Sequence, residues 1–391
     1  MADSVVHFPV KLIRYHFRDE MTIPLRPWLM RGLLLRKQVA CMLAQGGLGK
    51  SIFGLTIALH LAAGRDFGPF KCIGGRHRVA VLSVEEDADE IDRRLHAIAR
   101  VYEFTNEDAS NLFIIHAEDP IMASADRRGN VKATELSKEF ERLMMRDVMD
   151  AFVADPFIET WFGNENDNAQ VRAAAGVIRT ICRRMDAACL LTHHVRKGSV
   201  TPGDIDSGRG ASSLSGLVRL AYTMTPMSKD DAATLNIPSP KGIVRLDHAK
   251  GNYMPPPETA TWLKFRNVEL HNADPETERS GDHVGVLVPW SPPGLFEGIT
   301  YEKIDQILDA IAGGIDGLER YTLAPQSKDR YVGKVIAEVG EITEERAARI
   351  TLIWKKSGLL YEEDYLSGAQ RRMRKGILVD VEKRPSAMTE T

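Results

Sequence analysis

The sequence predicts an α/β fold, a mostly parallel sheet with helices on both faces, followed by a small C-terminal domain. From Gly32 to about Phe265, short apolar runs alternate with helical patterns. Strands that are apolar throughout are typical of parallel sheets that are buried on both faces. Beyond residues 286–299 the pattern changes to short amphipathic helices, which indicates a second domain.

The composition limits the classes of protein to which the chain can belong. Its 391 residues suggest two domains, and 43% hydrophobic residues suffice for a buried core. A formal net charge of −3 excludes a protein that coats nucleic acid through overall positive charge. No apolar run reaches about 18 residues, so we expect a cytoplasmic protein with no membrane partner. The cysteines lack paired spacing and are expected to be reduced: Cys41, Cys72, Cys182 and Cys189.

Four segments are expected along the chain: an arm at 1–24, a main domain at 25–285, a linker at 286–299 and a C-terminal domain at 300–391. The candidate strands of the main domain are 39–43, 79–84, 112–115, 151–154, 189–192, 217–223 and 243–249. The candidate helices between them include 51–63, 88–102 and 168–185.

A glycine-rich turn, Ala44-Gln45-Gly46-Gly47-Leu48-Gly49-Lys50-Ser51, follows the first core strand and precedes an apolar helix. Glycines let backbone N–H groups converge on phosphate oxygens, and the helix N-terminus favours the same anion. We expect this loop and Ile52 to bind ATP, with Lys50 reaching the β- and γ-phosphates and Ser51 holding Mg²⁺. The alternative interpretation is a turn with an incidental lysine.

Two predicted strands end in carboxylates that could serve a bound triphosphate. Asp155 is expected on the metal side, the alternative being a turn cap before Pro156. Glu85 ends a strand that we expect next to the strand of the phosphate loop, and there it could activate water. Glu86 is the rival for that role, and Asp150 is interpreted as the solvent edge of its strand.

A third predicted strand end carries two histidines, His193 and His194, which are expected at the same rim of the sheet. They could sense the γ-phosphate by hydrogen bonding. Two alternatives remain open: a zinc site, for which no cysteine or carboxylate lies at ligand spacing, and a purely structural pair.

The C-terminal segment predicts three helices and a hairpin. The second helix is expected from about Lys328 to Val339, and the third after Thr343 as N-cap. Two apolar runs, 358–361 and 376–379, flank a basic turn, which is the outline of a winged helix. The first helix buries a face with spacing i, i+3, i+4 and i+7: Ile304, Ile307, Leu308 and Ile311.

Four motifs in one order, AQGGLGKS, SVEED, FVADP and LLTHHVRKG, resemble those of the RepA-like branch of RecA/DnaB-type P-loop ATPases, the hexameric helicases of plasmids and phages. The similarity extends to IPLRPWL near residue 23, to 207–213 and to 249–253, and so covers most of residues 23–265. It implies a RecA-like main domain.

The resemblance also implies roles for individual residues. Lys50 and Ser51 match Walker A, Asp155 matches Walker B, and Glu85 matches the catalytic base. His194 matches the phosphate-sensing histidine of the family.

Other matched residues are expected to act on a neighbouring subunit. Arg209 matches an arginine that reaches into the neighbour's site, and Lys250 matches a trans-acting lysine. Asn252 departs from the arginine usual at its position, which leaves Arg209 as the finger candidate ahead of Arg219. The implied homo-oligomer is a six-subunit ring with single-stranded DNA in its channel.

Several basic residues are candidates for DNA contacts, in loops expected to face the ring axis: Lys197, Lys229 and Lys241. The C-terminal domain carries a denser cluster that could contact duplex DNA or dock a protein: Lys355, Lys356, Arg371, Arg372, Arg374 and Lys375.

The sequence thus favours a Mg²⁺-dependent ATPase that moves on or remodels DNA, a helicase of plasmid or phage type. Two alternatives stay open: a RecA-like recombination or repair ATPase, and a regulator in which nucleotide binding switches a winged-helix module.

Overall fold

The computed structural model describes residues 14–116, 122–195, 200–206, 211–235, 237, 239–273, 280–292, 294–317, 319–327, 329–368 and 371–385. The chain divides into two compact units. The first comprises Met1–Thr223, His248–Pro257 and Glu269–Val284, and the second comprises Met224–Asp247, Glu258–Val268 and Gly285–Thr391.

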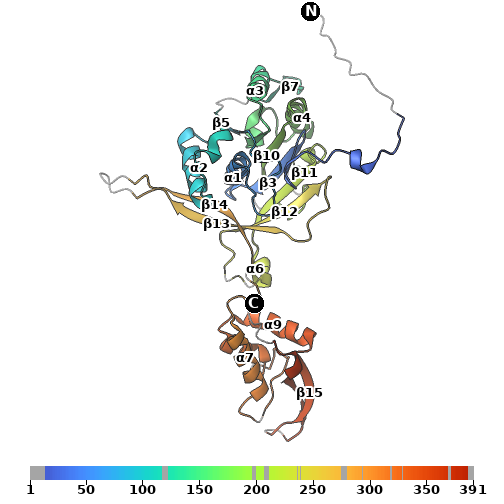
Figure 1. The fold of residues 1–391 in the computed structure, drawn as a ribbon, viewed down its shortest axis with the longest axis vertical. Coiled ribbons are helices and arrows are strands. Elements are labelled where there is room, and N and C mark those ends of the chain that lie inside the picture. Colours follow the sequence, from blue (N-terminus) through green and yellow to red (C-terminus); the bar gives the residue numbers. More distant parts are fainter. Residues whose placement is uncertain are drawn as a thin grey trace, which may run out of the picture. The chain divides into compact units, whose positions relative to one another are not determined.

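Five parallel strands form the core of the first unit (Figure 1). They run in the spatial order β3-β10-β8-β4-β5, and each neighbouring pair is parallel. Their bounds are β3 Val39–Gln45, β4 Val79–Ser83, β5 Leu112–His116, β8 Ala151–Asp155 and β10 Ala188–Val195. Because all five run the same way, their C-terminal ends meet at one rim.

Helices cover both faces of these strands. Helix α1 (Lys50–Ala63) approaches closely at Gly54, where an added Cβ would lie 3.1 Å from Cγ1 of Val153. The adjacent residue Phe152 points to the other face, where its ring lies 5.3 Å from that of Phe140 on α3 (Glu135–Arg146). Helix α4 (Asn168–Met185) joins α3 in that apolar layer. The predicted α/β fold with a mostly parallel sheet is confirmed.

The order of the strands corrects one expectation. Strand β4, which precedes Glu85, was expected next to β3, but β10 and β8 lie between them. The connection through α1 carries the chain across two strand positions, which later elements then fill. Sequence order does not specify such a crossover.

The full sheet has nine strands in the order β14-β13-β12-β11-β3-β10-β8-β4-β5. Strand β14 (His283–Trp290) overlaps residues that the sequence assigned to the linker 286–299, and β13 (Thr261–Glu269) was not expected. The pair β12–β13 is antiparallel. The remaining bounds are β11 Leu220–Pro226, β12 Ile243–Gly251, α2 Ala88–Tyr102, α5 Ala211–Ser215 and α6 Lys229–Leu235.

Small elements surround the main sheet. Strands β6 (Ala123–Ala125), β7 (Val131–Ala133) and β9 (Trp161–Phe162) form a three-stranded sheet, and β1 (Trp28–Met30) pairs with β2 (Leu34–Leu35). Short 3-10 turns lie at Glu20–Thr22, Asp108–Asn111, Phe157–Thr160 (η3) and Val381–Lys383.

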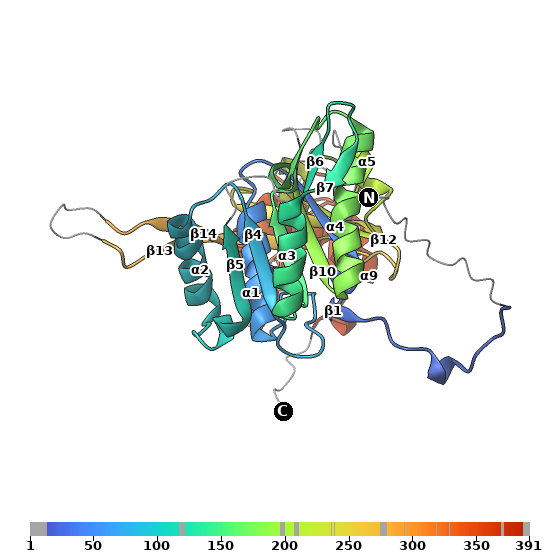
Figure 2. The same ribbon diagram turned by 90° about the horizontal axis from the view of Figure 1, so that it is seen from above.

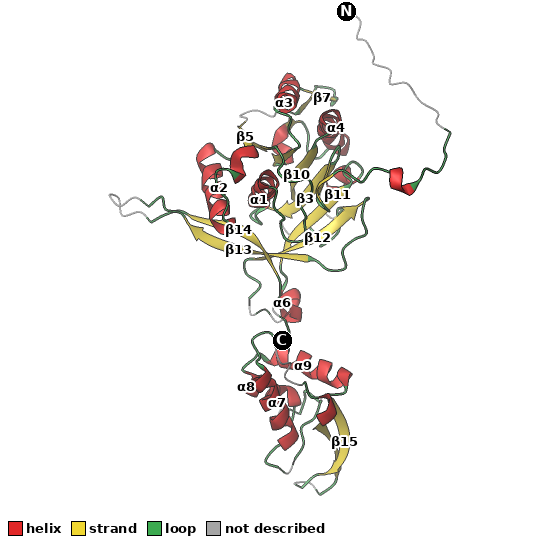
Figure 3. Cartoon of the chain, viewed as in Figure 1, coloured by secondary structure: helices red, strands yellow, loops and turns green. Residues whose placement is uncertain are grey.

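The C-terminal part of the second unit contains three helices followed by a two-stranded hairpin, the order that the sequence predicts (Figure 3). Helix α8 begins at Val332, later than expected, because Tyr331 forms a bridge with Thr322. Thr343 caps α9 as expected and accepts a hydrogen bond from the N–H of Arg346. The bounds are α7 Tyr301–Gly313, α8 Val332–Gly340, α9 Glu344–Ser357, β15 Leu360–Leu366 and β16 Met373–Val379.

Two sequence expectations concern features outside any site. All four cysteines are free, and burial raises the pKa of Cys41 to about 12. Among the helices of the described ranges, none is both long enough and apolar enough to span a bilayer.

Candidate nucleotide-binding site

The phosphate loop joins β3 to α1 at the C-terminal rim of the sheet. Gly47 and Gly49 have φ angles of +77° and +84°, a conformation that side chains disfavour. Cβ atoms added at Gly46 and Gly47 would meet nothing within 4 Å, so the loop presents open space beside its backbone. Of the other predicted loop residues, Ile52 is buried, whereas Leu48 and Ser51 are half-buried. An anion can therefore approach the main chain closely here.

Lys50 is the first residue of α1 and is only 3% exposed. Its Nζ donates hydrogen bonds to the carbonyl oxygens of Ala44 and Gln45, at 3.2 and 3.0 Å. Burial lowers the pKa of Lys50 to about 8, although the negative charges of Asp155 and Glu85 oppose that shift. The ammonium group is thus held within its own loop, where carbonyl oxygens take the place that phosphate oxygens could occupy.

Asp155 ends β8 and is 8% exposed. Its Oδ1 accepts a hydrogen bond from the hydroxyl of Thr192 on the neighbouring strand β10. Thr192 is fully buried, and sequence reasoning did not select it. The only signal for it was its position directly before the two histidines at a strand end. The structure therefore adds a residue that orients the predicted metal-side carboxylate.

Glu85 and His194 approach one another across this rim. Nε2 of His194 lies 3.9 Å from Oε2 of Glu85, and their side chains are 39% and 44% exposed. Burial, and then the charge of Asp155, raises the pKa of Glu85. Burial, and then the charge of Lys50, lowers the pKa of His194. Both shifts favour the uncharged form of the group concerned.

The rival carboxylate Glu86 has a different environment. Its Oε1 lies 2.6 Å from Nη2 of Arg94, which stands in the second turn of α2 and also binds Glu90. Glu86 is thereby held against α2, whereas Glu85 lies near His194. Glu159 of η3 is a further carboxylate that the sequence reading missed, and its charge contributes to raising the pKa of Glu85 after burial and Asp155.

His193 is the buried member of the histidine pair. It is 6% exposed, and its ring centroid lies 6.1 Å from that of Phe157. Within the described residues, no group of three His, Cys, Asp or Glu side chains could hold a metal ion. The zinc alternative therefore has no ligand set in this part of the chain.

Asp150 lies at the opposite end of β8 and is not a free solvent edge, which corrects its interpretation. Its carboxylate binds Arg36 and the N–H of Arg78, and it lies 3.7 Å from Nδ1 of His77. Burial opposes ionisation, but these hydrogen bonds outweigh it and lower the pKa of Asp150.

The residues expected to act in trans are only partly within the described residues. Arg209 and Lys197 lie outside them. Nζ of Lys250 donates a hydrogen bond to the carbonyl oxygen of Ser215, and the N–H of Asn252 donates one to that of Arg219. Both are contacts within the chain. Lys229 and Lys241 are exposed.

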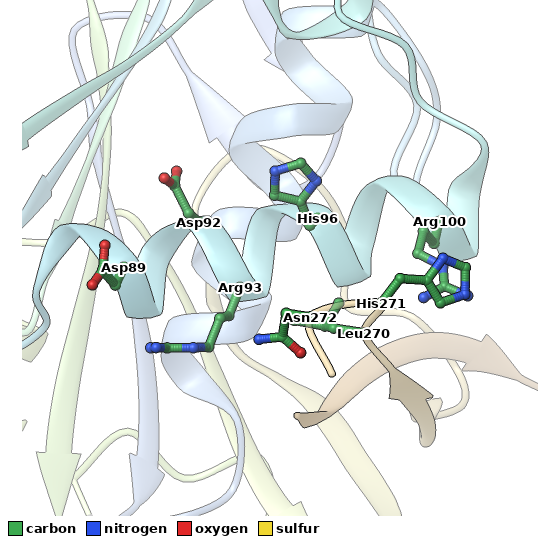
Figure 4. A pocket seen from close by; sticks show the side chains of 8 residues that line it. All are labelled: Asp89, Asp92, Arg93, His96, Arg100, Leu270, His271 and Asn272. Atoms are coloured by element: carbon green, nitrogen blue, oxygen red, sulfur yellow. The ribbon is translucent and has the colours of Figure 1, made fainter. Parts of the chain in front are cut away.

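A cavity of about 460 Å³ lies away from these residues, between α2 and residues 270–272 (Figure 4). Its arginines are already engaged: Arg93 binds Asp282 at 3.0 Å, and Arg100 donates to the carbonyl oxygen of Glu269 at 2.5 Å. None of its described lining residues is a predicted site residue. They are Asp89, Asp92, Arg93, His96, Arg100, Leu270, His271 and Asn272.

A parallel sheet with a glycine-rich loop, a buried lysine and two acidic strand ends at one rim defines a P-loop ATPase domain. A family model described as an AAA domain matches residues 9–200, a range that includes the loop, Glu85, Asp155 and His194. The matched range is thus similar to AAA-type P-loop ATPase domains. No curated protein matches the chain.

Proposed function

We propose that this protein is a Mg²⁺-dependent ATPase that works as a homo-oligomer on DNA, as a helicase or remodelling motor of plasmid or phage type. The observation that supports it most is the convergence of Lys50, Asp155 and the Glu85–His194 pair at one rim. Lys50 begins α1 after the glycine-rich loop, and the other three residues lie at the C-terminal ends of three different strands.

The chain supplies the groups that phosphoryl transfer requires. In this proposal the backbone N–H groups of 46–51 bind the phosphates, and Lys50 exchanges its carbonyl partners for phosphate oxygens. Mg²⁺ fits the hydroxyl and carboxylate oxygens of Ser51 and Asp155 and would neutralise charge on the triphosphate. Thr192 keeps the carboxylate of Asp155 oriented.

Glu85 is proposed as the general base. Its raised pKa makes its carboxylate a better proton acceptor from water than an unperturbed glutamate. His194, 3.9 Å away, is proposed to detect the γ-phosphate and to transmit its loss to β10. Glu86 is less suited because Arg94 binds it.

The oligomer and the DNA contacts rest on the motif resemblance together with charge. Arg209 and Lys250 are proposed to act on the site of a neighbouring subunit of a ring. Lys197, Lys229 and Lys241 are proposed to contact single-stranded DNA. The basic residues of 355–375 are proposed to contact duplex DNA or a protein.

One experiment tests this proposal. ATP hydrolysis is measured with and without single-stranded DNA, beside unwinding of a forked duplex. Stimulation together with unwinding supports a helicase. Stimulation without unwinding, on open filaments, favours a recombination ATPase. If DNA does not change the rate of ATP hydrolysis, and binding to duplex DNA depends on the nucleotide, the result favours a regulator and contradicts the proposal.

Mixing experiments test the shared site. Subunits carrying Arg209→Ala are mixed with subunits carrying Glu85→Gln. Restored hydrolysis is expected, because one subunit then supplies the base and the other the arginine. Activity that never exceeds the sum of the two separate variants contradicts a site shared between subunits.

A further inference from the structure

Arginines line one face of α4. Arg172, Arg179 and Arg183 are spaced i, i+7 and i+11, which puts them in a row about 16 Å long at 1.5 Å per residue. The guanidinium group of Arg172 lies close to Gly216, where an added Cβ would be 3.8 Å from Cζ of Arg172. Gly216 comes shortly before β11, so the row continues toward the start of that strand. Arg219 follows there. We call these four residues, Arg172, Arg179, Arg183 and Arg219, the arginine stripe.

The stripe has no acidic partner among the described residues, where none of its four members forms an ion pair within 4.0 Å. Arg184, on another face of α4, does have one: Glu141, at 3.4 Å. Arg179 and Arg219 are moreover half-buried. Partly desolvated like charges repel one another, so the stripe favours an anionic partner.

A second observation indicates that the positive charges of the arginine stripe lie close to one another. Burial, and then the charges of Arg183, Arg219 and Arg172, lowers the pKa of Arg179. The stripe also adjoins Lys250, which is proposed to act in trans: Lys250 donates a hydrogen bond to the carbonyl oxygen of Ser215, and the N–H of nearby Asn252 donates one to that of Arg219. Under the proposed function, this side of the domain therefore faces a neighbouring subunit.

The same chain carries a matching acidic surface at the start of α2. Asp89 and Asp92 are exposed, lie one turn apart, and form no ion pair in the described part of the chain. Figure 4 shows both carboxylates on α2 at the end of the cavity away from Arg100 and His271. Their neighbour Glu90 differs, because Arg93 and Arg94 bind it.

The stripe and these carboxylates cannot pair within one copy. Figures 1 and 2 both show α2 and α4 at opposite ends of the helices of the first unit, with α1 and α3 between them. Opposite charges on opposite ends of one domain can meet only between copies. Such a contact is head-to-tail and propagates into a ring or a filament.

We propose that the arginine stripe of one copy binds Asp89 and Asp92 on α2 of a second copy. The inference rests on the oligomer of the proposed function and identifies the surfaces that form it. In such a contact, the start of α2 in one copy, which follows Glu85 closely in sequence, faces the surface of the next copy that carries Lys250.

The test is assembly by the full-length protein, measured by sedimentation velocity with Mg²⁺ and a non-hydrolysable ATP analogue. Arg172→Glu/Arg183→Glu and Asp89→Arg/Asp92→Arg are each expected to weaken assembly by about tenfold or more, because like charges then face each other. Mixing the two variants is expected to restore assembly. Arg184→Glu, the same charge change on another face of α4, is the matched control. Thermal melting of each variant verifies folding.

The outcomes separate the hypotheses. If both double variants assemble as well as the wild type, the proposed stripe contact is wrong, while the proposed function is unaffected. Loss of assembly without recovery on mixing also overturns the pairing. Weakened binding of a single-stranded oligonucleotide with unchanged assembly identifies nucleic acid as the occupant instead, and overturns the proposal. A wild-type protein that stays monomeric contradicts both the stripe contact and the oligomer.

Discussion

Nε2 of His194 lies 3.9 Å from Oε2 of Glu85, although their strands β10 and β4 are separated by β8. The strand between them, β8, ends in Asp155 at the same rim of the sheet. The proposed base, the proposed phosphate-sensing histidine and the proposed metal-side carboxylate are thereby grouped at three neighbouring strand ends.

Glu85→Gln is expected to lower the rate of ATP hydrolysis by about 10²–10⁴-fold while ATP binding is retained, because the amide cannot accept the proton of water. Glu86→Gln is expected to change the rate far less, since Arg94 binds Glu86. Steady-state hydrolysis and equilibrium binding of a fluorescent ATP analogue measure the two effects. If Glu86→Gln gives the larger loss of rate, the roles of the two glutamates are reversed.

Thr192→Val is expected to destabilise the protein by about 1–3 kcal/mol, because it leaves a buried oxygen of Asp155 without its donor. The variant should also need more Mg²⁺ for half-maximal hydrolysis. Thr192→Ser keeps the hydroxyl and serves as the control. Urea unfolding and Mg²⁺ titration measure these effects, and equal Mg²⁺ requirements for the valine and serine variants would contradict the orienting role.

ATP binding is expected to take up a proton at pH values somewhat above 8. The pKa of Lys50 is lowered to about 8 in the free protein, and the negative triphosphate should raise it toward its ordinary value. Affinity therefore decreases as pH rises through that range. Calorimetry in buffers with different ionisation enthalpies measures the proton count directly. Lys50→Arg, which does not titrate there, should bind more weakly and without uptake; uptake that persists in this variant would exclude Lys50 as its source.

The His77–Asp150 pair is expected to make stability depend on pH. Burial lowers the pKa of His77, but hydrogen bonds to Asp150, to Cys72 and to the Ile73 carbonyl outweigh it and raise the pKa to about 9. A raised histidine pKa stabilises the fold fully below the ordinary value of 6.5, and this contribution is lost as pH rises through 9. Asp150 stays ionised throughout that window because its pKa is lowered.

His77→Gln is accordingly expected to cost about 2 kcal/mol near pH 6.5 and much less above pH 9. Urea unfolding of the wild type and the variant at several pH values measures the difference. A cost that is the same at every pH would show that His77 contributes by packing alone.

Much of the fold could be predicted because its signals are local. Runs such as 39–43 and 151–154 are apolar throughout, and the structure has β3 and β8 there, with the glycine-rich loop and Asp155 at their C-terminal ends. The N-cap at Thr343 could also be predicted, since a threonine directly before a helical pattern can accept a hydrogen bond from a backbone N–H of the first turn. Strands β13 and β14 were missed because exposed and half-buried residues interrupt their apolar residues, although each pairs with the strand next to it along the chain.

The candidate site divides in the same way. Lys50, Glu85, Asp155 and His194 could be selected because each stands at a strand end or in a glycine-rich turn. Thr192 and Glu159 could not, because a threonine inside a strand and a glutamate in a short turn are ordinary until their neighbours are known. Choosing between Glu85 and Glu86 likewise required the position of Arg94.

By itself, the sequence determined the apolar core strands, where the glycine loop bends and which charged groups stand at the ends of those strands, since these depend on backbone conformation and near neighbours. Only the tertiary structure decided that β10 and β8 lie between β3 and β4, and therefore which side chains face each other. The physical reason is that strand neighbours are set by how crossover helices pack on the sheet. That packing depends on many weak contacts between segments that are distant in sequence, so it cannot be predicted from any short stretch of sequence.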